Sequence, residues 1–79
     1  MDAAEIRKVV LAELKRIAPE LEEVAPTKPL RDQVDLDSMD WLNFLVALNG
    51  RLKIEIPEAD YRKLGTLDQV VAYLAAKVR

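Results

Sequence analysis

Apolar residues recur at three- and four-residue steps in three stretches of the chain, and this spacing predicts three main helices. The first helix begins near Asp2 or Ala3. Asp2 is suited to cap it, and Glu5 three residues later completes a capping-box pattern. Pro19 ends it, because the residue before a proline avoids helical geometry. One side of this helix carries the apolar stripe of Ile6, Val9, Val10, Leu14 and Ile17.

A second helix is predicted from Ser38 to Asn49 or slightly beyond. Asp37 stands at its expected N-cap, where an aspartate side chain accepts a bond from a free backbone amide. Gly50 is a possible stop signal, although Leu52 continues the apolar spacing. The end of this helix therefore stays open.

The C-terminal part predicts one short and one long helix. An extended link through residues 53–56 is closed by Pro57, and Glu58–Lys63 is expected to form the short helix. Gly65 interrupts the chain, and Thr66–Gln69 has the pattern of a capping box. The last helix then places on its core side Val70, Val71, Leu74 and Val78.

Residues 18–37 form a long connection between the first two main helices, and such loops are often functional. A short turn of helix is expected at Glu20–Val24. The predicted fold is all-α, a small four-helix bundle of three main helices and one short one, in a single domain spanning 1–79. The loop is expected to attach to the core through Leu21, Val24, Leu30, Val34 and Leu36.

The predicted second helix has two apolar faces. Met39, Leu42 and Val46 fall on a side that is separate from the wide aromatic stripe. A bundle of 79 residues rarely buries both faces of one helix, so we expect this smaller face to be exposed and offered to partners. In the alternative interpretation, Met39 and Leu42 contact the long loop as part of the core. The aromatic stripe, expected to face the core, comprises Trp41, Phe44, Leu45, Leu48 and Leu52.

Composition excludes several functions. Cysteine and histidine are absent, which removes disulfides, the usual zinc sites, thiol nucleophiles and histidine bases. The net charge of −2 disfavours nucleic-acid binding. Insertion into a membrane is not expected, and an N-terminus without a signal-peptide pattern makes the cytoplasm the expected compartment. An enzyme would depend on carboxylates such as Glu22, Glu23, Asp35 and Asp37, and we expect no useful pocket around them.

Ser38 is the candidate for covalent chemistry. Its hydroxyl follows the long loop and stands at the positive end of the second helix, where an attached phosphodiester would meet free backbone amides. Asp37 and Asp40 repel such an anion, so they suit contacts with a basic enzyme or with a magnesium ion that arrives with the donor. Both also have structural roles, in capping and with the helix dipole. A serine at a helix start is common, and Ser38 has no nearby base to make it a nucleophile.

The run Asp37-Ser38-Met39-Asp40 resembles the Asp-Ser-Leu signature of acyl carrier proteins. The resemblance extends through nearly the whole chain and includes, in order, Leu45-Val46-Ala47-Leu48, Ile54-Glu55-Ile56-Pro57 and Gly65-Thr66-Leu67. It implies that a magnesium-dependent phosphopantetheinyl transferase attaches 4'-phosphopantetheine from coenzyme A to Ser38, beside Asp37. The terminal thiol of the arm would hold an acyl group as a thioester. Loading ligases and downstream synthases would be the other partners, and a monomer is expected.

The resemblance also implies two sets of contact residues. Partner enzymes would dock on the second helix, at Asp37, Met39, Asp40, Leu42, Asn43 and Val46. The attached chain would occupy a pocket whose candidate residues are Phe44, Leu45, Tyr61 and Leu64.

Two departures from the fatty-acid carriers favour a specialised member. Met39 follows the serine where those carriers usually have leucine, and methionine also occurs there in D-alanyl carriers. Asn43 and residues 49–51 occupy positions where those carriers have several glutamates, so docking should depend more on apolar contact. A D-alanyl or aminoacyl carrier remains an alternative, and so does a helical interaction module without covalent cargo.

Overall fold

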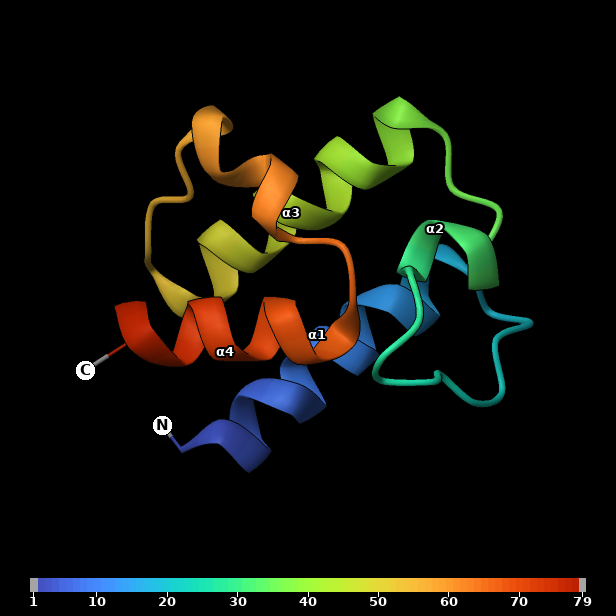
Figure 1. The fold of residues 1–79 in the computed structure, drawn as a ribbon, viewed down its shortest axis with the longest axis horizontal. Coiled ribbons are helices and arrows are strands. Elements are labelled where there is room, and N and C mark those ends of the chain that lie inside the picture. The colour runs from blue at the N-terminus through green and yellow to red at the C-terminus, as the bar shows by residue number, and fades with distance from the viewer. Residues whose placement is uncertain (1, 79) are drawn as a thin grey trace.

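The computed structural model describes residues 2–78, and it confirms the all-α fold. Its elements are α1 (Ala3–Ile17), α2 (Leu30–Gln33), α3 (Ser38–Leu52), a short 3-10 helix η1 (Glu58–Lys63) and α4 (Leu67–Lys77). Helix α1 packs against both α4 and α3. In Figure 1, α3 runs diagonally behind η1, and the long connection with α2 lies on the side where α3 begins.

One core joins the helices, and it contains the apolar stripes that the spacing predicts. Ile6, Val10 and Leu14 of α1 are fully buried, while Val9 and Ile17 pack partly buried at the edge. All five residues of the aromatic stripe of α3 are buried. Trp41 is thus part of the core, and its ring centroid lies 5.2 Å from that of Phe44.

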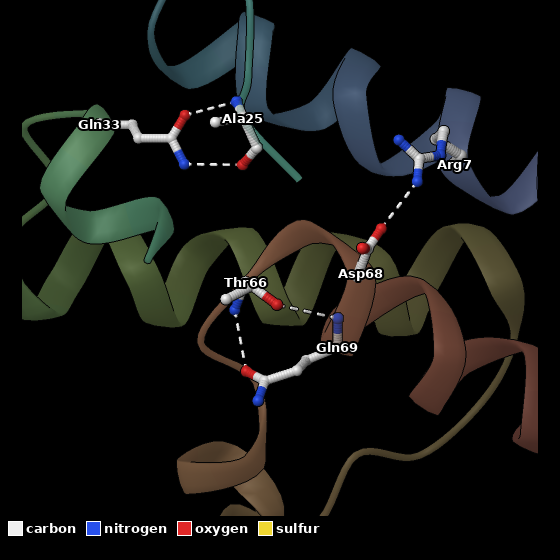
Figure 2. Close-up of polar contacts among 6 residues, drawn as sticks. All are labelled: Arg7, Ala25, Gln33, Thr66, Asp68 and Gln69. Atoms are coloured by element: carbon white, nitrogen blue, oxygen red, sulfur yellow. Dashed lines mark hydrogen bonds and ion pairs between the residues drawn. The ribbon is translucent and has the colours of Figure 1, made fainter. Parts of the chain in front are cut away.

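Side-chain caps begin the three long helices at the predicted residues. Asp2 accepts a hydrogen bond from the amide of Glu5 at 2.9 Å. Thr66 accepts from the amide of Gln69 at 3.1 Å, and the Gln69 side chain accepts from the amide of Thr66 at 3.0 Å, which completes the capping box (Figure 2). These reciprocal bonds fix where α4 starts.

The long connection contains a helix, but not where the sequence predicts one. The prediction of a short helical turn at Glu20–Val24 is wrong, and α2 forms instead at Leu30–Gln33. Pro29 precedes α2, with its ring fixing φ near the helical value. The Gln33 side-chain amide binds both the N–H and the C=O of Ala25, at 2.7 and 2.9 Å (Figure 2). This tertiary contact stabilises a helix too short to be stable alone.

Contacts with the start of α4 hold the same connection in place. The amide of Leu30 donates to the carbonyl of Gly65 at 2.8 Å, and the amide of Asp68 donates to the carbonyl of Pro26 at 3.1 Å. Figure 2 shows the Asp68 carboxylate bound to Arg7 of α1 at 2.8 Å. As predicted, apolar side chains attach the loop to the core: Leu30, Val34 and Leu36 are buried, and Leu21 and Val24 are partly buried.

Helix α3 continues past Gly50 to Leu52, so the glycine does not end it. Burial of Leu52 favours the extra turn. Arg51 also reaches α1, where its guanidinium lies 3.2 Å from the buried Glu13 carboxylate. The left-handed residue at the end of the helix is Lys53, with a φ of 54°. A lysine therefore occupies the conformation that glycine adopts most easily.

Candidate functional site

Ser38 is the first residue of α3, and it is exposed. The residues around it in the chain are firmly held: Leu36 precedes it and Trp41 follows it in the core. Ser38 therefore lies on an exposed turn between two buried residues. Because it lies next to the unpaired amides of a helix start, the position accommodates a phosphodiester.

Asp37 performs the structural task at this turn. Its carboxylate accepts a hydrogen bond from the amide of Asp40 at 2.8 Å, and its carbonyl accepts from the amide of Trp41 at 3.0 Å. With Asp37 as the cap, the Ser38 hydroxyl is not required for the helix to begin. The oxygen is thus free for attachment chemistry.

The smaller apolar face of α3 is exposed, as predicted. Met39 is 66%, Leu42 41% and Val46 54% exposed. The alternative in which Met39 and Leu42 belong to the core is therefore wrong. Asn43 is exposed on the same side of the helix, while Asp40 is half-buried near its start. The structure thus places these side chains on one surface that begins at Ser38.

One cation near the site was missed by the sequence reasoning. Arg31 lies in α2, and its guanidinium approaches the carbonyl of Leu36 at 3.5 Å, two residues before Ser38. No pattern in the sequence indicates this neighbour, because α2 itself was not predicted. This contact places a positive charge against the segment of chain that leads into Ser38.

The predicted pocket residues lie in the core beside η1. Phe44, Leu45 and Leu64 are buried, and Tyr61 of η1 packs partly buried against the same cluster. These side chains belong to the same hydrophobic core cluster. An acyl chain that entered here would have to separate them.

A polar contact holds η1 against α4 next to these residues. The Tyr73 hydroxyl of α4 donates a hydrogen bond to the Asp60 carboxylate, and Lys63 lies 3.3 Å from that carboxylate. The bond from Tyr73 is the main cause that lowers the pKa of Asp60, and the charge of Lys63 adds to it. Burial, together with the Asp60 contact, raises the pKa of Tyr73 to about 12.

Three of the carboxylates considered for an enzyme, Glu22, Glu23 and Asp35, line one surface hollow. Glu22 and Glu23 line a surface groove whose walls include Arg7 and Lys15 of α1. Asp37 is occupied as a helix cap. Within residues 2–78, acidic side chains form no group of three that could hold a metal ion. Over the same residues, no helix combines the length and the apolar character needed to cross a membrane.

Comparison with known proteins assigns this arrangement to a family. Residues 4–74 match the sequence model described as "Phosphopantetheine attachment site". A curated relative from Helicobacter hepaticus named acyl carrier protein is 33% identical over 76 residues, which cover 96% of this chain and 97% of the relative. The chain belongs to the acyl carrier protein family.

Further acyl carrier proteins match over nearly the same extent. One from Chlorobium luteolum is 28% identical across 98% of this chain and the whole of the relative. One from Streptomyces coelicolor is 31% identical across 94% of this chain and 78% of its own length. Membership makes this protein a non-catalytic carrier with a phosphopantetheine attachment domain. The exposed helix start at Ser38 fits that group.

Proposed function

We propose that this protein holds acyl intermediates as thioesters on a 4'-phosphopantetheine arm that is attached to the hydroxyl oxygen of Ser38. The observation that carries the proposal is the exposed Ser38 hydroxyl at the start of α3, with Asp37 supplying the cap. Ser38 is also the only serine of the chain. The arm supplies the thiol that a chain without cysteine lacks.

Attachment requires a separate enzyme. The serine oxygen forms a bond to the phosphorus of coenzyme A that carries the pantetheine. The bond from that phosphorus to the adenosine bisphosphate leaving group breaks. The hydroxyl proton passes to a base of the transferase, because no histidine exists in this chain to accept it. The backbone amides at the start of α3 then hold the phosphodiester, with Arg31 nearby.

Partner enzymes are proposed to dock on α3. Asp37 and Asp40 meet cationic residues of the partner at the Ser38 end. The three exposed apolar side chains, with Asn43 beside them, supply the area that is removed from water. A loading ligase and downstream synthases would use this surface in turn, and the protein would act as a monomer in the cytoplasm.

The core beneath η1 supports a short or branched cargo. Trp41 and Phe44 are bulky and in contact, and Phe44, Leu45 and Leu64 are buried together with Tyr61 at their edge. Little room remains for a long chain unless these side chains move apart. A long acyl chain found sequestered among them would contradict this part of the proposal.

A D-alanyl or aminoacyl carrier is the second candidate function. Met39, which follows the attachment serine as it does in D-alanyl carriers, is the most exposed of the three apolar residues of α3. A polar amino acid on the arm would not need a pocket in the core. Loading by an aminoacyl-adenylating ligase, and not by an acyl ligase, would favour this alternative.

The test is incubation of the purified chain with coenzyme A, Mg²⁺ and a broad-specificity phosphopantetheinyl transferase, followed by intact-mass spectrometry. The parent should gain one phosphopantetheinyl group, and Ser38→Ala should gain none. A helical interaction module without cargo would instead bind its partner equally well with alanine at this position. An unmodified parent would contradict the carrier function.

A further inference from the structure

Gly50 is an unusual residue for its place in α3. It lies inside the helix, and its backbone does not require a glycine, since its φ is not positive. Packing within the chain does not require one either, because a Cβ built on Gly50 meets nothing within 4 Å. Glycine is a poorer helix former than alanine at such a position. Neither the fold nor the backbone of this chain therefore explains it.

The position of Gly50 on the helix suggests a reason. It follows Val46 by four residues and Met39 by eleven, so all three lie along one side of α3. Arg51, the next residue, turns to α1 and binds Glu13. The aromatic stripe on the opposite side of α3 is buried, so the side that bears Gly50 faces away from the core, and Gly50 is exposed on it. We call the exposed residues Met39, Leu42, Asn43, Val46 and Gly50 the uncharged face.

Charge indicates what covers this face. From Met39 to Gly50 it carries no ionisable side chain, whereas Asp37 stands before it and Lys53 after it. An enzyme that binds the phosphates of coenzyme A must be cationic where it meets Ser38, and it complements Asp37 and Asp40 there. Where the enzyme covers the uncharged face, it must present an uncharged, apolar element, because a charge buried there would be unpaired.

The size of an ordinary interface makes contact with Gly50 reasonable. Gly50 follows Ser38 by twelve positions along the helix, a rise of about 18 Å. A standard interface covers roughly 800 Å² on each partner, which corresponds to a patch about 30 Å across. An enzyme seated over Ser38 and aligned with α3 therefore extends to Gly50.

We propose that Gly50 is the close-approach point at which the phosphopantetheinyl transferase packs against the backbone of α3. This inference rests on the proposed attachment at Ser38. The absent side chain lets an uncharged element of the transferase approach the helix more closely than any other residue of the uncharged face permits. Gly50 thus determines specificity through contact area and lies far from the chemistry.

The test measures stability and loading on the same variants. Gly50→Ala and Gly50→Leu add a side chain into open space in the free protein, so Tm should rise by about 2–6 °C for the alanine variant. In the complex, the added atoms overpack the contact. With a broad-specificity transferase, coenzyme A and Mg²⁺, we expect kcat/KM for loading of Gly50→Leu to fall about tenfold, mainly through KM. The kcat/KM for loading of Gly50→Ala should fall by a smaller factor.

Ala12→Leu is the matched control, because Ala12 is exposed on α1, outside the uncharged face. It should leave the loading rate unchanged. If the parent is loaded and Gly50→Leu is loaded at the same rate, the inference is overturned while attachment at Ser38 stands. If the parent is not loaded at all, the proposed function fails and the inference fails with it. If loading falls only in proportion to a lowered Tm, the close-approach role is also overturned.

Discussion

The Asp37 carboxylate accepts a hydrogen bond from the backbone amide of Asp40 at 2.8 Å, and this bond closes the turn that displays Ser38. Asp37 and Ser38 thus have separate roles at the start of α3. The Asp37 side chain stabilises the helix, and the Ser38 hydroxyl stays available. Attachment chemistry and folding are therefore separable at adjacent residues.

That separation can be measured by chemical denaturation. Asp37→Ala should lower the free energy of unfolding by about 1 kcal/mol, because the amide of Asp40 loses its acceptor. Ser38→Ala should change it by less than about 0.5 kcal/mol, as expected for an exposed residue without a capping role. Equal losses for the two variants would mean that the serine shares in the cap.

The end of α3 offers a second stability test. Lys53 adopts the left-handed conformation with a φ of 54°, which is unfavourable for a side chain with a Cβ. Lys53→Gly should raise the free energy of unfolding by about 0.5–1 kcal/mol. Lys53→Ala removes the charge but keeps the Cβ, so it should bring no such gain. A gain for both variants would assign the effect to charge.

The contact between Tyr73 and Asp60 predicts a dependence of stability on pH. The lowered pKa of Asp60 contributes stability above the ordinary value of 3.8, and this is lost as the pH falls below it. The pKa of Tyr73, raised from 10.0 to about 12, contributes stability that is fully present below pH 10 and is lost as the pH rises toward 12.

Tyr73→Phe removes both contributions, so its Tm should be lower than that of the parent at neutral pH. The difference should narrow below pH 3.8 and above pH 10. Tyr61→Phe is the control, since the polar contact of η1 with α4 is made by Tyr73. A constant difference between Tyr73→Phe and the parent across the whole pH range would show that the hydrogen bond contributes no stability.

The sequence was sufficient where local chemistry decides the structure. Asp37 and Thr66 begin their helices through bonds that span three residues, and the spacing of Met39 and Val46 against Phe44 separates the two faces of α3. Such relationships lie within a few residues of each other and are readable in order along the chain.

Tertiary contacts decide the features that the sequence could not show. Helix α2 depends on the Gln33 side chain reaching Ala25, and on the amide of Leu30 finding the carbonyl of Gly65. Arg31 comes near Ser38 only because α2 exists. A pairing between residues this far apart leaves no periodic pattern, so it becomes visible only in the folded chain.

The most direct test of the central claim locates the attached group. Cleavage after Arg31 and Arg51 releases residues 32–51, a peptide whose only hydroxyl side chain is Ser38. After loading with coenzyme A, Mg²⁺ and the transferase, tandem mass spectrometry should find one phosphopantetheinyl group on this peptide, at Ser38. The same group on any other peptide, or its persistence in Ser38→Ala, would contradict the account.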